Sequence, residues 1–141
     1  MTTFFDTSVF VSACQRNHEC HAWSLNAFAS ANKTSAACSA HSLAEVYAVT
    51  TGMPREYKVA PEDASLFLRQ ISERCQLIAL DAEEYLAAVD SVVHKQLPGG
   101  IIYDALLVAC ARKSQADRIL TWNLKHFKLL APDLAERIIT P

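Results

Sequence analysis

Hydrophobic residues along this chain change repeatedly from short continuous runs to the spacing of an amphipathic helix. Runs typical of β-strands occur at residues 3–6, 33–40, 75–80 and 118–122, and a last short one closes the chain. Helical spacing of apolar residues lies between them. Strands that alternate with helices predict βα units in a parallel sheet. Because no low-complexity linker and no repeat of fixed period interrupts this order, we expect a single domain over residues 1–141.

Residues that favour helix ends mark the boundaries of the predicted helices. Ser42 and Glu45 have the spacing of a capping box. Pro61 suits the first turn of the next helix, and Asp81 suits the N-cap of the one after it. The strand-like run between these last two helices is apolar enough to predict a buried strand.

Composition indicates a globular protein without a strongly basic surface. Hydrophobic residues make up 51% of the 141 residues and charged residues 20%, which allows a proper core. The formal net charge is −2, so the chain lacks the excess of Lys and Arg by which many proteins hold nucleic acid through counterion release. A polyanionic partner would therefore have to be held by cations or by local basic residues.

Cysteine usage and the lack of a long apolar segment give an expectation for the compartment. The five cysteines form neither a CxxC pair nor a regular disulfide framework, so we expect reduced thiols. No charged leader precedes an apolar segment at the N-terminus, and no apolar stretch reaches the roughly 18 residues of a membrane span. We therefore expect a cytoplasmic protein with no membrane partner.

Three acidic residues lie in segments that would otherwise belong to the core. Asp6 follows the first strand-like run, Glu45 lies one turn into a helix, and Asp104 lies in the apolar segment IIYDALLVACA. A lone buried carboxylate is costly unless it is paired or binds a metal. Ligands of open parallel sheets bind at the carboxyl ends of the strands. We therefore expect the three carboxylates to converge on one pocket that holds a cation.

Each of these acids also has a structural alternative. Asp6 could cap the following helix, although Thr7 and Ser8 are available to share that task. Glu45 could serve the capping box described above. Asp104 could be a cap or lie at a solvated edge, although its segment is apolar on nearly all sides.

The expected chemistry of such a pocket follows from its charge. Three carboxylates cannot all ionise side by side without a compensating charge, and a hard divalent cation such as Mg²⁺ supplies it through oxygen ligands. Two such ions can hold the attacking and leaving oxygens of an in-line phosphoryl displacement. A nuclease of this kind needs acids rather than a basic surface.

Four segments, in this order and at these separations, resemble the signature segments of PIN domains, and most closely those of VapC-type toxins of bacterial toxin–antitoxin pairs: FFDTSVFVSA, SLAEVYAVTT, IYDALLVACA and ILTWNLKHF. The similarity covers residues 3–140. It implies a three-layer α/β/α fold with a central parallel sheet, endoribonuclease activity that depends on Mg²⁺ or Mn²⁺, a homodimer, and neutralisation by a small cognate antitoxin. The resemblance places Asp6, Glu45 and Asp104 at the positions of the family's first three acids.

The chain departs from the family pattern after its fourth strand. Many similar sequences carry another acid there, and this chain has Asn123. An amide oxygen can bind a hard cation but brings no charge, so affinity for a second metal should fall. Asparagine also occurs at this position in similar sequences, so we do not interpret it as inactivation. Thr121 could hold this loop or a water on the metal, or its hydroxyl could bond to backbone.

Several further residues are weaker candidates. Basic residues that could contact the RNA backbone, or could simply be solvated, are Arg55, Lys58 and Lys125. Residues that offer only one half of a paired zinc site are Cys14, His18, Cys20 and His21. We interpret His126 as a surface histidine on a short helix, with substrate contact as the alternative.

Two other classes of function stay open at this point. A phosphoaspartyl hydrolase would use Asp6 as nucleophile and a second Asp two residues later, where this chain has Ser8. A degenerate PIN-like module that binds RNA or a partner without catalysis is favoured by Asn123 and by the modest charge. The three acids argue against it, because a binder of polyanions gains nothing from them.

Apolar residues exceed what one sheet can cover. They include Val9, Phe10, Trp23 and Tyr47, and we expect some of them to form an exposed association patch. Such a patch would serve the homodimer and the antitoxin.

Overall fold

A sheet of five short parallel strands forms the centre of the computed structural model, which describes all residues from Met1 to Pro141. The strand order is β3-β2-β1-β4-β5, and every pair of neighbours is parallel. The strands are β1 (Thr3–Phe5), β2 (Ala36–Ser39), β3 (Gln76–Ile78), β4 (Arg118–Leu120) and β5 (Ile138–Ile139). The predicted parallel sheet is confirmed.

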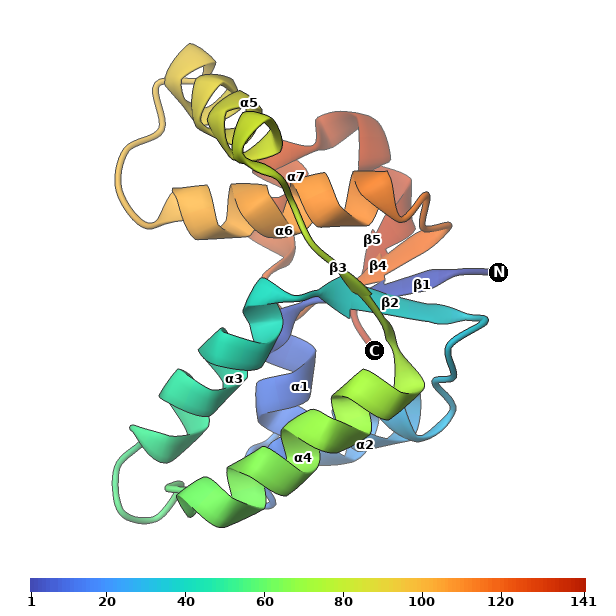
Figure 1. Ribbon diagram of the computed structural model, residues 1–141, viewed down its shortest axis with the longest axis vertical. Helices are drawn as coiled ribbons and strands as arrows, with labels where there is room; N and C mark the ends of the chain where they lie inside the picture. The colour runs from blue at the N-terminus through green and yellow to red at the C-terminus, as the bar shows by residue number, and fades with distance from the viewer.

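Helices cover both faces of the sheet (Figure 1). Those on one face are α1 (Thr7–Cys14), α2 (His21–Ala29), α3 (His41–Thr51) and α4 (Pro61–Arg74). Those on the other face are α5 (Ala82–His94), α6 (Ile101–Lys113) and α7 (Leu124–Leu130), followed by a 3₁₀ turn at Pro132–Arg137. The molecule is therefore the expected three-layer α/β/α sandwich.

Two hydrophobic clusters fill the spaces between these layers. Phe4 belongs to the cluster under α6 and α7, and the next residue, Phe5, belongs to the cluster under α1 and α2. Successive side chains of a strand point to opposite faces, so a strand covered on both faces has to be apolar throughout. This explains why β1 consists of the buried run TFF.

The register of the sheet brings three chain segments to the same edge. Phe5 pairs with Cys38 on one side and with Leu120 on the other. The residues that follow β1, β2 and β4 therefore leave the sheet at one level. Because the strand order reverses at β1, this edge is the switch point at which ligands of such sheets bind.

The starts of two helices agree with the predictions from sequence, and the start of a third differs. Pro61 begins α4, and Asp81 and Glu84 form a complete capping box on α5. The capping box predicted for Ser42 and Glu45 is wrong. Helix α3 begins at His41 without a side-chain cap, because the hydroxyl of Ser42 is turned toward α1.

Two burial predictions are also wrong. β3 is an edge strand, and its Gln76 and Leu77 are exposed, because only β2 pairs with it. Val9 and Phe10 are fully buried instead of forming a surface patch, since α1 lies between the sheet and its neighbours α2 and α3. Trp23 is exposed, as expected.

All five cysteines are free thiols, and three of them are buried: Cys38, Cys75 and Cys110. None of the helices combines the length and the apolar character that crossing a membrane requires.

Candidate active site

Asp6 lies directly after β1, in the N-cap position of α1, but its side chain does not cap the helix. Its Oδ2 accepts hydrogen bonds from Ser8 Oγ at 2.6 Å and from Thr121 Oγ1 at 2.7 Å. The residue is only 3% exposed. Both of these side-chain hydrogen bonds end on Oδ2, so Oδ1 is the oxygen that remains for a ligand.

The two hydroxyls that hold Asp6 also join the ends of β1 and β4. Ser8 Oγ accepts a hydrogen bond from the backbone N–H of Trp122 at 3.0 Å. Thr121 Oγ1 accepts one from the backbone N–H of Asn123 at 2.9 Å. Thr121 thus bonds a carboxylate and not only backbone, and the loop that carries Asn123 is fixed relative to Asp6.

Glu45 projects from the first turns of α3 toward the same edge. Thr7 Oγ1 donates a hydrogen bond to Glu45 Oε1 at 3.2 Å, and the Ser42 and Thr7 hydroxyls lie 2.9 Å apart. When Thr7 donates to the carboxylate, Ser42 donates to Thr7. His41 Nε2 lies 3.7 Å from the same Oε1. The Glu45 side chain, which was predicted to take part in a capping box on α3, is thus held by Thr7 of α1.

Asp104 lies in the first turn of α6 and meets two residues of the β4–α7 segment. Its Oδ2 lies 3.3 Å from Asn123 Nδ2 and 3.0 Å from His126 Nδ1. His126 Nδ1 and Asn123 Nδ2 are themselves 2.9 Å apart. Asp104 is therefore neither a helix cap nor a freely solvated side chain.

The electrostatics of the site disfavour its ionised carboxyls. Burial raises the pKa of Asp6 above its ordinary value against the lowering effect of the Ser8 and Thr121 hydrogen bonds, and the charge of Asp104 raises it further. Burial also raises the pKa of Glu45, while His41 and the Thr7 hydrogen bond lower it, and the charges of Asp6 and Asp104 raise it. No Lys or Arg is among the causes of these two pKa shifts, and none forms a salt bridge with Asp6, Glu45 or Asp104.

This donor set fits a hard divalent cation. It offers carboxylate oxygens, an amide and hydroxyls, with an unused oxygen on the buried Asp6. The side chains are not drawn into a closed cage, and no three His, Cys, Asp or Glu side chains form a ready-made metal group. His18, Cys20 and His21, named above as a weak candidate for one half of a zinc site, do not form a ready-made metal group either.

The basic residues proposed to contact RNA lie at different places. Lys125 is in the first turn of α7, two residues after Asn123. Arg55 follows the C-terminal end of α3, whereas Glu45 lies near its beginning. Lys58 lines a hollow of the surface that Asp6, Glu45 and Asp104 do not line. Of the three basic residues, Lys125 is the one next to a residue of the acidic edge in sequence, and RNA contact stays a prediction for all three.

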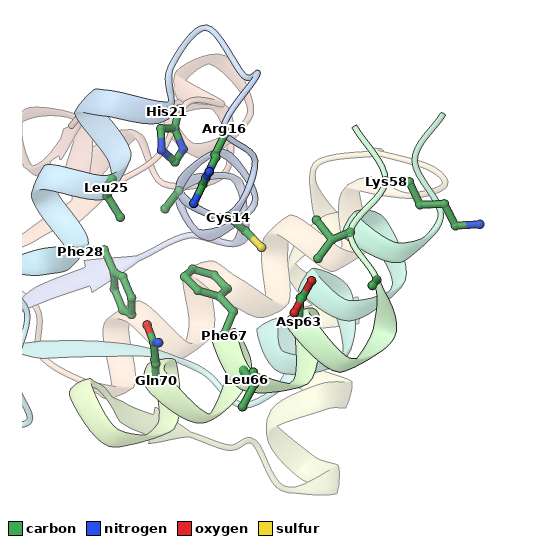
Figure 2. A pocket seen from close by; sticks show the side chains of 13 residues that line it. Cys14, Arg16, His21, Leu25, Phe28, Lys58, Asp63, Leu66, Phe67 and Gln70 are labelled. Atoms are coloured by element: carbon green, nitrogen blue, oxygen red, sulfur yellow. The ribbon is translucent and has the colours of Figure 1, made fainter. Parts of the chain in front are cut away.

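This hollow lies between α1, α2 and α4 and has a volume of about 540 Å³. Figure 2 shows Phe28 and Phe67 between the helices and the Lys58 side chain extending away from them. The two rings meet edge to face, with their centroids 5.4 Å apart. Leu66 on α4 is 61% exposed at its border. The hollow is thus lined by apolar side chains together with charged ones such as Arg16 and Asp63, and none of Asp6, Glu45 and Asp104 lines it.

The structure also brings to the site residues that the sequence did not assign to it. His41 contacts Glu45, and its ring stacks parallel to that of Tyr103 with centroids 6.0 Å apart. His126 contacts Asp104 instead of standing alone on the surface. Its spacing of three residues from Asn123 was a usable signal, because positions three apart share one face of a helix.

Comparison with known proteins gives the class to which this site belongs. The family model of the PIN domain matches residues 3–130. The chain belongs to the PIN-domain family. It is homologous to VapC ribonucleases of Mycobacterium tuberculosis. It is 33% identical to ribonuclease VapC27 over 112 residues, which is 79% of this chain and 78% of VapC27. It is 31% identical to ribonuclease VapC40 over 120 residues, which is 85% of each chain.

Solved structures show the same fold. The crystal structure of Mycobacterium tuberculosis VapC20, a toxin that cleaves the sarcin–ricin loop, matches with a TM-score of 0.71 and 16% identity, over 89% of this chain and 92% of that one. A crystal structure of VapBC2 from Rickettsia felis, bound to a DNA fragment from its promoter, matches with a TM-score of 0.62 and 23% identity, over 92% of each chain.

Proposed function

We propose that this protein is a metal-dependent endoribonuclease that acts as the toxin of a toxin–antitoxin pair. The observation that carries the proposal is the meeting of Asp6, Glu45 and Asp104 at the carboxyl edge of the sheet with no Lys or Arg to neutralise them. Homology to VapC ribonucleases supports the same activity.

The residues that would hold Mg²⁺ or Mn²⁺ are Asp6, Glu45 and Asp104, with Asn123 as an uncharged neighbour. When bound, the cation supplies positive charge that favours deprotonation of a water and stabilises charge developing on the phosphate. Ser8 and Thr121 orient Asp6, and Thr7 orients Glu45, so the carboxylates keep their positions before RNA arrives. Such orientation lowers the cost of reaching the transition state.

The proposed reaction is hydrolysis of an internal phosphodiester bond. The oxygen of a water forms a bond to phosphorus while the bond from phosphorus to the 3′ oxygen breaks. The departing oxygen takes up a proton, and the products carry a 5′-phosphate and a 3′-hydroxyl. Lys125, two residues after Asn123 on α7, is the first proposed contact to the RNA backbone, and Arg55 and Lys58, between α3 and α4, are further proposed contacts.

Cleavage of purified RNA tests this proposal. We expect internal cuts with Mg²⁺ or Mn²⁺, none in EDTA, and recovery when metal is restored. The Asp104→Asn variant should lose activity by at least about a hundredfold, because it removes one charge from the site. Analysis of the new ends should find 5′-phosphates. A cyclic phosphate product would show that the ribose 2′-hydroxyl is the nucleophile, and cleavage that continues in EDTA would show that the reaction needs no metal; either result contradicts the proposal.

A degenerate binding module is the second candidate, and Asn123 is the observation that favours it. If structured transfer and ribosomal RNAs bind but stay intact at every metal concentration, this candidate becomes the better account. The phosphoaspartyl alternative is not supported, because Ser8 takes the place of its second Asp and donates to Asp6.

The proposed partners are a second copy of the chain and a small cognate antitoxin. Apolar surface supports both proposals, since exposed apolar side chains gather on α5 and around the hollow between α1, α2 and α4. The free thiols fit the proposed cytoplasmic location.

A further inference from the structure

Three polar atoms from α6, the β4–α7 loop and α7 form a small triangle at the site. They are Asp104 Oδ2, Asn123 Nδ2 and His126 Nδ1, and the sides of the triangle measure 3.3, 3.0 and 2.9 Å. Phe127, the next residue along the chain, is fully buried in the core and anchors α7, which places the backbone of His126 beside Asp104. The His126 side chain is 48% exposed and contacts Asp104 and Asn123 at the surface.

While Asp104 is ionised, hydrogen bonding alone cannot satisfy this triangle. If His126 Nδ1 carries a proton, it donates to Asp104 and faces the Asn123 amide N–H₂, which is also a donor. If it carries none, it accepts from Asn123, and its lone pair faces an ionised carboxylate. Rotation of the amide by 180° exchanges its nitrogen for Oδ1. Two acceptor oxygens then share one proton, so every arrangement leaves one pair of like groups in contact.

A cation above this triangle, bonded to each of its corners, would satisfy all three atoms at once. With the amide rotated, the corners are a carboxylate oxygen, an amide oxygen and an imidazole nitrogen, each of which offers a lone pair. Ligands on one face of an octahedron with bonds of about 2.1 Å lie about 3.0 Å apart. The three sides of the triangle agree with that spacing.

We propose that His126 is a metal ligand, together with Asp104 and Asn123, and that it makes the site prefer Mn²⁺ to Mg²⁺. The proposal rests on the proposed function, because Asp104 also belongs to the group formed with Asp6 and Glu45. Imidazole binds first-row transition metals well, whereas Mg²⁺ prefers oxygen. A histidine three residues after Asn123 therefore compensates for the missing fourth acid with a ligand of different metal preference.

Pulsed electron paramagnetic resonance of bound Mn²⁺ tests the proposal without any need for activity. A directly bound imidazole nitrogen produces ¹⁴N modulation of the Mn²⁺ signal, so the wild-type protein should show it and His126→Ala should not. Calorimetric titration should show a loss of Mn²⁺ affinity of at least about tenfold in His126→Ala, because even second-layer partners of metal sites contribute about 10- to 100-fold. Mg²⁺ affinity should change much less.

His41→Ala is the matched control, since His41 contacts Glu45 at the same site. It should keep both the ¹⁴N modulation and the preference for Mn²⁺. A wild-type protein that binds Mn²⁺ without ¹⁴N modulation, or a modulation that survives in His126→Ala, overturns the role of His126 and leaves the proposed nuclease intact. Absence of any metal binding to the wild type overturns both proposals.

Discussion

Asp6 shows how a single residue can cost stability for the sake of a site. Its carboxyl is buried, its pKa is raised mainly by that burial, and the charge of Asp104 adds to the effect. A carboxyl whose pKa is higher in the folded protein stabilises the fold at low pH, below its ordinary value of 3.8. This contribution is lost as the pH rises through the folded value. The metal-free protein therefore carries a penalty at neutral pH.

The substitution Asp6→Asn should remove this penalty. We expect a higher free energy of unfolding than in the metal-free wild type at pH 7, because the amide oxygen can still accept from Ser8 and Thr121 without a charge. Near pH 4 the gain should shrink, since the wild-type carboxyl is then taking up its proton. Urea titrations in EDTA at the two pH values measure both effects. A gain that is equal at both pH values would contradict the electrostatic explanation.

Added Mn²⁺ provides the control for this experiment. A ligand that binds only the folded state stabilises it by mass action. The metal should raise the melting temperature of the wild type more than that of Asp6→Asn. The difference in stability between the two proteins should therefore shrink or change sign.

The individual residues of the site were partly predictable from sequence. The positions of Asp6 and Thr121 at one edge of the sheet could be predicted. Each lies at the end of a strand-like run, and the strands of a parallel sheet end at one edge. The bond from Ser42 to Thr7 could not be found in this way, because it joins the starts of two different helices. His126 was interpreted as a surface residue because nothing in the local sequence shows that α6 brings Asp104 to it.

Among the helices, α1 is the one whose burial was predicted wrongly from the sequence. The helix is apolar on most sides, and an all-round apolar pattern does not say which faces meet other elements. In the fold the sheet, α2 and α3 cover it. The aromatic rings of Phe10, Phe5 and Phe28 form a packed series, with centroid separations of 5.7 and 5.6 Å.

Replacement of aromatic residues on α1 and α2 should therefore have very different effects. Phe10→Ala should destabilise the protein by about 3 to 5 kcal/mol, because it opens a cavity in the core. Trp23→Ala should change stability by no more than about 0.5 kcal/mol, since Trp23 is 64% exposed. Thermal and urea unfolding of the two variants measure this contrast. Equal losses would mean that Trp23 packs against another element or another molecule.

The edge strand β3 shows the same limit of sequence reasoning for the sheet. Its apolar run was predicted to be buried, yet it pairs only with β2 and leaves Leu77 partly exposed. Strand order in a sheet depends on contacts between distant segments, and a hydrophobic run does not reveal whether it lies at the centre or at the edge.

For the whole molecule, two separate apolar surfaces match the two proposed partners. The exposed stripe on α5 contains Leu86 and Val93, each 65% exposed, on one helix face. A convex helix face can pair with its own copy about a two-fold axis. The hollow between α1, α2 and α4 is suited instead to a helix that inserts apolar side chains into a groove.

Charged substitutions on the two surfaces should separate the two partners. The double variant Leu86→Glu and Val93→Glu should shift the protein from dimer to monomer, while Leu66→Glu should weaken antitoxin binding by about tenfold or more and leave the dimer intact. Light scattering at tens of micromolar measures the dimer, and titration with the cognate antitoxin measures its binding. Circular dichroism confirms that both variants stay folded. If each variant affects the other partner instead, the assignment of the two surfaces is reversed.

The position of β1 at the centre of the sheet has a consequence for how the protein is made. Phe5 pairs with Leu120, and Asp6 accepts its hydrogen bond from Thr121, which follows it by 115 residues. During translation the first strand leaves the ribosome long before the segment that completes its edge exists. The acids, the loop of Asn123 and the imidazole of His126 can meet only after about nine-tenths of the 141 residues have been joined. A nascent chain therefore cannot assemble the proposed site until its synthesis is nearly complete.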